Sequence, residues 1–375
     1  MSISNVNMRN NELVFEISNI DLSFVNALRR IILSEIPSIA FRTEPYDKSM
    51  VKIINNTSNL HNEFIVHRIG MIPIHIKDVE TFDIINYKFV LNVKNTTHTT
   101  IDVTTKDINV LKLNNGEFIP VGKDIRDSFF PPDPLTKDHI LIMRLKPDNT
   151  GKNEGEHLHF EATASKSNGN ENARWSVVSQ ASFQYKIDPK KAEVALQEYL
   201  QKHQNKKGSN LSDNEIETLK NRFRLTFADR YYHTNERLEP DEFIMTIESI
   251  GVMNPKDIFK QSIHILSDKL KQFINKIENE HPSIEIVKSD SLQEAYDVNI
   301  KDEDHTLGYL LQSYITNLYD DINYVGYVQP HPLENKIVLR LSLDTIDNVK
   351  KYIIDCCNKI IIMADTFSKE VSNNM

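Results

Sequence analysis

Residues 15–33 read FEISNIDLSFVNALRRIIL, and residues 298–316 read VNIKDEDHTLGYLLQSYIT. The two stretches align without a gap at a constant offset of 283 positions (298 − 15 = 283). Each begins with alternating apolar and polar residues, a pattern typical of a strand, and continues into an apolar-rich run with helical spacing. The pattern indicates two copies of one strand–helix unit, far apart in the chain.

Each expected helix follows an acidic turn that ends in a hydroxyl residue. Ser23 precedes the run Phe24–Glu35, and Thr306 precedes the run Leu307–Leu318. Because Ser and Thr side chains often accept hydrogen bonds from the first free amides of a helix, we predict that Ser23 and Thr306 are the N-caps.

Both helical runs are apolar on more than one side. A helix that covers only its own sheet shows a narrower apolar stripe, so each of these helices requires a second neighbour. A strand and a helix cannot bury their apolar faces alone, and the simplest neighbour is the matching helix of the other copy. The residues expected in this inter-copy packing are Phe24, Leu28, Ile31, Ile32, Leu307, Leu310, Leu311 and Tyr314.

Each copy is expected to close with a further strand and a long helix. The first copy has a strand at Phe243–Ile250 and a helix at about Pro255–Glu278; the second has a strand at Ile337–Leu343 and a helix at about Thr345–Phe367. Apolar residues in both helices recur every three or four positions, an average of about 3.5 that favours a helix–helix seam. Packing of each long helix on its own sheet is the alternative.

These patterns predict an α+β fold in which two copies of one strand–helix unit pack as an intramolecular pseudo-dimer, with a strand-rich domain inserted in the first copy. The predicted domains are 1–41 with 239–280 for the first unit, 42–238 for the insertion with a helical excursion near 190–222, 281–292 for a linker, and 293–375 for the second unit.

Composition limits the classes of function. The net charge of −9 argues against a protein that mainly grips phosphate backbones, because Lys and Arg carry that affinity. The two cysteines, Cys356 and Cys357, are adjacent and poorly placed for a disulfide or a CxxC metal site, which indicates a reducing, intracellular setting. We find no membrane-spanning run, signal peptide, phosphate-binding glycine loop, nucleophile elbow or acidic triplet, and we expect no catalytic residue, metal or cofactor.

Several long motifs resemble a known family. NALRRIILSEIPSIAF (26–41) and NTSNLHNEFIVHRIGMIPI (56–74) resemble the third subunit of eukaryotic RNA polymerase II and its archaeal and bacterial alpha-type relatives. Residues 139–187 and 241–251 continue this similarity, and residues 297–343 resemble the eleventh subunit, the partner of the third. Fusion of the two partners in this order is similar to the arrangement in some large cytoplasmic DNA viruses.

The resemblance implies a non-catalytic assembly platform of a DNA-directed RNA polymerase. The implied partners are the second-largest and largest subunits and small tenth- and twelfth-subunit-like chains, with little or no direct contact with nucleic acid and none with a membrane. The viral arrangement implies the host cytoplasm and the virion. Matched motif by motif, the implied partner-interface residues are Asn26, Arg29, Arg30, Glu63, His67, Arg68, Arg174 and Trp175.

Plainer interpretations stand beside these. Arg29 and Arg30 can be one salt-bridged and one solvated side chain, and Trp175 can be a core residue instead of an exposed anchor. The segment ETFDIINYKFV (80–90) has no cysteine, so the zinc site that eukaryotic third subunits carry there should be absent. Two other functions remain open: a free-standing adaptor that kept the fused fold, and a metal enzyme that uses His157 and His159, which share one face of an expected strand.

Overall fold

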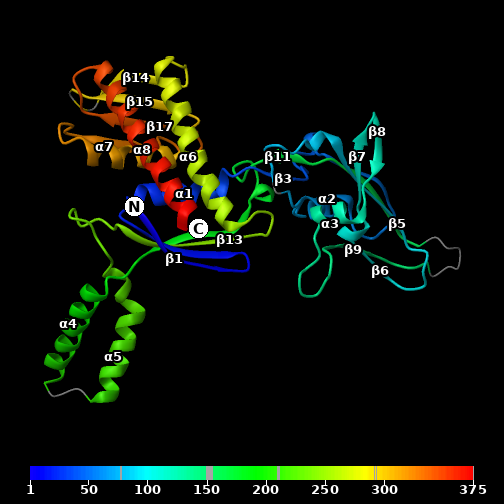
Figure 1. Ribbon diagram of the computed structural model, residues 1–375, viewed down its shortest axis with the longest axis horizontal. Helices are drawn as coiled ribbons and strands as arrows, with labels where there is room; N and C mark the ends of the chain where they lie inside the picture. Colours follow the sequence, from blue (N-terminus) through cyan, green and yellow to red (C-terminus); the bar gives the residue numbers. More distant parts are fainter. Residues whose placement is uncertain (77, 149–154, 209–211, 291, 293, 375) are drawn as a thin grey trace. The chain divides into compact units, whose positions relative to one another are not determined.

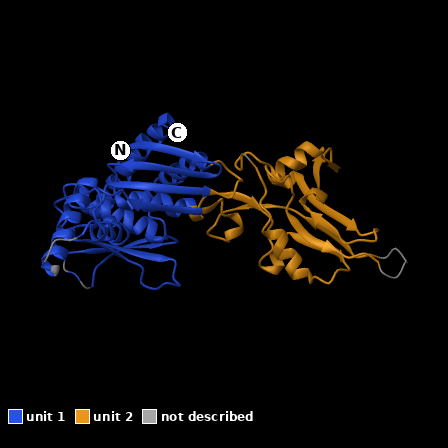
Figure 2. Ribbon diagram, turned by 90° about the horizontal axis from the view of Figure 1, so that it is seen from below, with its two compact units in different colours: residues 1–32, 180–248, 255–375 blue, residues 33–179, 249–254 orange. Residues whose placement is uncertain are grey.

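The computed structural model describes residues 1–375 except residues 77, 149–154, 209–211, 291, 293 and 375. The described residues form two compact units, which Figure 2 shows in different colours. Unit 1 comprises residues 1–32, 180–248 and 255–375, and unit 2 comprises residues 33–179 and 249–254.

The first copy of the repeat is built on a four-stranded sheet. Helix α1 (Leu22–Ser34) follows β2, and helix α6 (Pro255–Glu278) follows β13. Alternate residues of β2 are fully buried, which explains why the apolar face of this sheet needs helices to cover it. The strands in spatial order are β1 (Ser2–Arg9), β2 (Glu12–Ser18), β13 (Glu242–Ser249) and β12 (Val178–Tyr185).

The second copy repeats this arrangement strand for strand. Helix α7 (His305–Leu318) follows β15, and helix α8 (Ile346–Asn374) follows β17. In both sheets the strand that precedes the short helix and the strand that precedes the long helix lie in the centre. The strands in spatial order are β14 (Ile284–Lys288), β15 (Tyr296–Lys301), β17 (Lys336–Leu341) and β16 (Val325–Val328).

The two copies share one core, which confirms the predicted pseudo-dimer. Helices α6 and α8, one from each copy, pack side by side, and α8 also contacts β1 of the first copy (Figure 1). The ring of Phe367 on α8 lies edge-to-face against Phe24 of α1 at 6.1 Å and against Phe259 of α6 at 6.0 Å between centroids. Three aromatic rings therefore join the copies at one point. Edge-to-face contacts between rings stabilise a protein by more than the burial of the ring surface alone.

Most residues of the predicted seam are buried. The α6 stripe from Phe259 to Ile277 is buried throughout, whereas on α8 Met363 is half-buried and Ile346 is 40% exposed. Cys356 and Cys357 lie in this packing, and burial raises the pKa of Cys356 to about 12, as expected of an unreactive thiol.

The predicted inter-copy residues are buried, except that Tyr314 is half-buried and donates its hydroxyl hydrogen to Sδ of Met363 in its own copy. Their partners differ in part from the prediction. Phe24 meets the long helix α8, and the matching helices α1 and α7 meet through polar side chains. Long helices can reach across both sheets, which the short matching helices cannot do.

The predicted N-caps were wrong by two residues in each copy. Helix α1 begins at Leu22, and the Asp21 carboxylate accepts the amide hydrogen of Ser23 at 2.7 Å. Asp304 caps α7 in the same way, accepting the amide hydrogen of Thr306 at 2.8 Å. An aspartate caps as well as a hydroxyl residue and adds a negative charge at the positive end of the helix.

The predicted linker at 281–292 is also corrected, although residue 291 lies outside the described residues. Residues Ile284–Lys288 form strand β14, which pairs antiparallel with β15. Helix α6 ends at Glu278, so only a short turn joins the copies. The carboxylate of Glu280 in this turn accepts a hydrogen bond from Nζ of Lys350 on α8 at 2.7 Å.

The division into units differs from the predicted domains. Strand β12 is an edge strand of the first sheet, and residues 180–248 belong to unit 1. The expected helical excursion forms α4 (Pro189–Lys207) and α5 (Asp213–Thr226) within these residues, with Gly208 in the left-handed conformation at the end of α4. Unit 2 is therefore shorter than the predicted insertion.

Unit 2 is strand-rich, as expected. Its core gathers Phe41, Phe89, Phe129, Phe130 and Phe160 beside a five-stranded sheet, with helices α2 (Asn62–Gly70) and α3 (Lys123–Phe129). The strands of the main sheet in spatial order are β4 (Val51–Asn56), β10 (His157–Ala162), β5 (Tyr87–Lys94), β7 (Asn109–Asn114) and β8 (Glu117–Pro120). Two small sheets pair β3 (Ser38–Ala40) with β11 (Ser165–Ser167) and β6 (Ile101–Thr104) with β9 (Leu141–Leu145).

The cluster around Phe367 predicts a large loss of stability on truncation. Replacing Phe367 by alanine should lower the free energy of unfolding by about 3–5 kcal/mol, because a buried ring is lost and a cavity is left. Urea-induced unfolding of the full chain measures this. The control is Ile362→Ala on the same helix, where the side chain is 66% exposed and the change should stay within about 0.5 kcal/mol. Equal losses in the two variants would show that these rings do not hold the copies together.

Candidate partner-binding surfaces

Arg30, expected at a partner interface, makes contacts within the chain. Its Nη2 donates to Oδ2 of Asp304 at 2.6 Å, and its Nε donates to the Thr306 hydroxyl oxygen at 2.7 Å. Arg30 lies on α1 of the first copy, while Asp304 and Thr306 begin α7 of the second. One arginine thus donates hydrogen bonds to both the N-cap residue and the first turn of the opposite helix.

The equivalent contact exists in the other direction. At the offset of 283, Asp21 corresponds to Asp304, and Arg30 corresponds to Ser313 (30 + 283 = 313). The Ser313 hydroxyl donates to the Asp21 carboxylate at 3.1 Å, and Nδ2 of Asn317 donates to the same carboxylate at 3.2 Å. Contacts exchanged between equivalent positions are the mark of a twofold interface, here formed within one chain.

The surroundings of Asp304 favour its ionised form. Burial alone would raise the pKa of Asp304, but hydrogen bonds from Thr306 and from Arg30, together with the Arg30 charge, hold that pKa below its ordinary value. About a third of the Arg30 and Asp304 side chains remains exposed. The pair therefore orients the copies more than it stabilises them.

Asn26 and Arg29 lie beside each other on α1. Nε and Nη2 of Arg29 both donate to Oδ1 of Asn26 at 3.0 Å. Burial, and after it the neighbouring charge of Arg30, lowers the pKa of Arg29. The two residues are half-buried, and their contact with a partner stays a prediction.

The structure contradicts an exposed anchor at Trp175. The Trp175 side chain is 1% exposed, and its Nε1 donates to the carbonyl oxygen of Ser165 at 3.0 Å. The Arg174 side chain is only 4% exposed and donates to the carbonyl oxygen of Phe41 and to the Thr43 hydroxyl. These two residues close the core of unit 2, so the plainer reading of Trp175 is the correct one.

Helix α2 carries the other implied interface residues, and these are exposed. Ile65 and Ile69 are fully buried on one side of the helix, while Glu63 and His67 face solvent. Arg68 is exposed too, although its guanidinium donates to the carbonyl oxygens of Ile142 and Leu141 at 2.7 and 2.9 Å. Helix α2 thus has a firmly packed inner side and an accessible outer side.

Phe64 and Met71 were missing from the predicted site residues. Phe64 is 65% exposed, and Met71, which directly follows the last residue of α2, is 60% exposed. The sequence could have indicated them, because positions 64, 67 and 71 are three and four residues apart. In a helix this spacing gives a shared face, opposite to Ile65 and Ile69. We call Phe64, His67, Arg68 and Met71 the outer face of α2.

The metal-enzyme alternative gains no support. The His157 ring meets Nδ2 of Asn55 at 2.8 Å and Oδ1 of Asn92 at 2.7 Å, so amides occupy both ring nitrogens. The described part of the chain holds no cluster of three or more His, Cys, Asp or Glu side chains suited to a metal. No helix among the described residues combines the length and apolarity needed to cross a bilayer.

The fold and the exchanged contacts define a fused pair of dimerisation units. The RNA polymerase Rpb3/Rpb11 dimerisation domain matches residues 14–270 and again residues 295–370, one match for each copy. The chain belongs to the family of RNA polymerase Rpb3/Rpb11 dimerisation domains.

Curated relatives are similar over most of their length. The chain is 31% identical to "DNA-directed RNA polymerases I and III subunit rpac1" of Dictyostelium discoideum over 298 residues, which cover 72% of this chain and 80% of the relative. It is 26% identical to "DNA-directed RNA polymerase II subunit rpb3" of the same organism, covering 70% of this chain and 90% of the relative. The human RPAC1 subunit of polymerases I and III is also 26% identical, covering 73% and 83%.

Substitutions at Asp304 should separate its two roles. Asp304→Asn keeps a capping acceptor and removes the charge, whereas Asp304→Ala removes both. Because loss of an N-cap costs about 1 kcal/mol, the alanine variant should be less stable than the asparagine variant by roughly that amount. Thermal or urea-induced unfolding measures it, and equal stabilities would show that Asp304 does not cap α7.

Acidification should remove the electrostatic part of the stability that Asp304 contributes. A carboxylate whose pKa is lowered by folding stabilises the protein above its ordinary pKa, and this contribution is lost as the pH falls through the lowered value. From the ordinary value of 3.8 downward, the stability difference between the wild type and Asp304→Asn should therefore shrink. A difference that is constant from pH 7 to pH 2 would contradict the pairing with Arg30.

Proposed function

We propose that this chain is a non-catalytic assembly-platform subunit of a DNA-directed RNA polymerase, serving DNA-templated transcription. Its family and the names of its relatives support the polymerase setting. The platform docks the second-largest subunit, which in turn gathers the largest, and small tenth- and twelfth-subunit-like chains attach beside them. The catalytic residues lie in the other subunits.

The observation that carries the docking step is the outer face of α2. Exposed apolar side chains that lie close together and are surrounded by polar residues often mark interaction sites, whereas single exposed apolar residues are common. Aromatic side chains ringed by polar groups are typical hot spots of interfaces, and here His67 and Arg68 flank Phe64. The segment is also the one whose motif resembles the large-subunit contact of the family.

Fusion suits this role because it fixes the ratio of the two halves. Joining the copies turns their encounter into an intramolecular one and raises their effective concentration. The short turn between α6 and β14 leaves the copies little freedom to separate. A partner then meets a preformed surface and does not bear the cost of ordering it.

We infer that the polymerase is of the type carried by large cytoplasmic DNA viruses, with the host cytoplasm and the virion as its locations. The fused order of the two partners supports this. Mass spectrometry of purified virions and of cytoplasmic fractions tests it, and recovery from nuclear polymerase alone would count against it.

The docking step is tested by the double substitution Phe64→Asp and Met71→Asp. We expect the variant to fold normally, since both side chains are exposed, and to recover at least about 30-fold less second-largest subunit after co-expression, because losing a hot spot costs about 2 kcal/mol or more. Affinity purification with quantitative blotting measures the recovery.

The matched control is Leu135→Asp in the same unit, where the side chain is 90% exposed and lies outside α2. Its recovery should equal that of the wild type. Full recovery with the double variant would move the docking site away from α2. A wild-type chain that never sediments with the large subunits would favour the free-standing adaptor instead.

A further inference from the structure

The pseudo-symmetry of unit 1 is broken at one edge. Strand β1 in the first sheet and β14 in the second are equivalent edge strands. Helix α8 contacts β1, and Ile3 on β1 is only 6% exposed. By symmetry α6 should cover β14, but α6 has 24 residues and α8 has 29. The difference of five residues leaves α6 shorter by about 7.5 Å.

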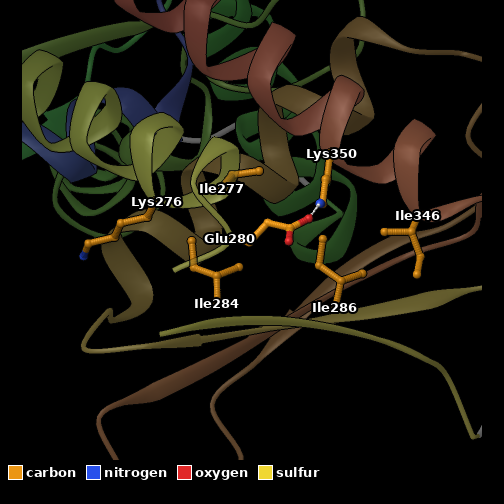
Figure 3. A pocket seen from close by; sticks show the side chains of 7 residues that line it. All are labelled: Lys276, Ile277, Glu280, Ile284, Ile286, Ile346 and Lys350. Atoms are coloured by element: carbon orange, nitrogen blue, oxygen red, sulfur yellow. Dashed lines mark hydrogen bonds and ion pairs between the residues drawn. The ribbon is translucent and has the colours of Figure 1, made fainter. Parts of the chain in front are cut away.

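A cavity of about 250 Å³ lies where the missing turns of α6 would cover β14. It is lined by Ile277 of α6, Ile284 and Ile286 of β14, and Ile346 of α8, with Lys276 and the Glu280–Lys350 ion pair at its rim. Figure 3 shows Ile284 and Ile286 pointing from the strand toward the helices. The volume is several times the ~30 Å³ of a water molecule, so it has room for one large apolar side chain.

The backbone beside this cavity is also unpaired. The bonds Lys301 N–H to Ser283 C=O and Ser289 N–H to Ala295 C=O fix the register of β14 on β15. In an antiparallel pair the bonded residues alternate, so the N–H and C=O groups of Ile286 and Lys288 point away from β15. The described residues place no strand on that side of β14. Such an edge is a template for one further strand.

The charges around the cavity select the kind of strand. Lys276 is half-buried at the rim, and Lys288 is exposed on the same face of β14 as Ile286. Among the described residues no carboxylate lies within ion-pair distance of Lys276 or Lys288, whereas Lys350 is paired with Glu280. Two unpaired cations beside an apolar cavity favour an acidic partner.

We infer that the outer edge of β14 is a docking site for an extended, acidic segment of a partner polypeptide. The segment continues the second sheet through the free backbone groups of Ile286 and Lys288. An apolar side chain fills the cavity, and carboxylates two residues away on the same face approach Lys276 and Lys288. This surface is separate from the outer face of α2 and goes beyond the proposed docking of the second-largest subunit.

Two fluorescein-labelled peptides of equal composition test the inference. In TDTFTDT the phenylalanine and both aspartates share one face of a strand, whereas in TTDFDTT the aspartates lie on the face opposite to the phenylalanine. Fluorescence anisotropy with the full chain should give weak binding of TDTFTDT, with a Kd on the order of 100 µM for so short a segment. TTDFDTT should bind at least about threefold more weakly, since rim charges contribute modestly.

Variants locate the binding. Ile284→Phe fills the cavity and should weaken TDTFTDT binding about tenfold, whereas Val287→Ala on the opposite face of β14 should leave it unchanged. Lys288→Pro removes an outward N–H that the sheet does not use, so the fold should persist. The control is Lys288→Ala, which loses only the charge. Binding of TDTFTDT to Lys288→Pro should be about tenfold weaker than binding to Lys288→Ala, because a backbone hydrogen bond is lost as well. Melting temperatures identify any variant that fails to fold.

Three results would overturn the inference. One is equal affinity for the two peptides. Another is unchanged binding of TDTFTDT to both Ile284→Phe and Lys288→Pro. The third is a dimer of the wild-type chain in sedimentation that Lys288→Pro converts to a monomer, since the edge would then belong to a second copy of this chain.

Discussion

Mutual coverage of two incomplete cores is the constraint on which unit 1 depends. Each copy supplies a sheet with one apolar face and helices that are apolar on more than one side, and neither copy has enough material to close its own core. The long helices meet this need because each reaches beyond its own sheet. The ring of Phe367 shows it directly, since a residue near the end of the second copy is held by Phe24 and Phe259 of the first. Separating the copies would expose these rings, and the fusion makes separation rare.

Polar contacts then select one arrangement from the many that apolar packing would tolerate. Hydrophobic burial has little direction, whereas the capping carboxylates of Asp21 and Asp304 accept hydrogen bonds only from donors at the right place on the opposite helix. The two sides use different residues for this purpose. One side uses the charged guanidinium of Arg30, and the other uses the neutral Ser313 and Asn317. A homodimer must use the same residue on both sides, so the difference is a freedom that two unlike copies possess.

The same freedom explains where surfaces remain available for other chains. Because α6 is shorter than α8, a cavity remains beside the edge strand β14 of the second sheet, while α8 contacts the equivalent strand β1 of the first sheet. In unit 2 the helix α2 buries Ile65 and Ile69 and leaves Phe64 and Met71 exposed. Both surfaces belong to elements that are packed on their other side, so they are held in place before a partner arrives.

The amino-acid sequence alone determined the repeat, its α+β class, the inter-copy pairing and the long-helix seam, because the periodicity of apolar residues and a gapless offset are properties of the chain itself. The resemblance of its motifs also pointed to Glu63, His67 and Arg68, which the structure then placed on an exposed side of α2. Only the tertiary structure decided that Arg30 is committed to Asp304, that Arg174 and Trp175 are buried, and that residues 284–288 form a strand. The physical reason is the same in each case. An arginine or a tryptophan has the same local pattern at a surface and in a core, and its role depends on which distant backbone and side-chain groups folding brings within hydrogen-bond distance.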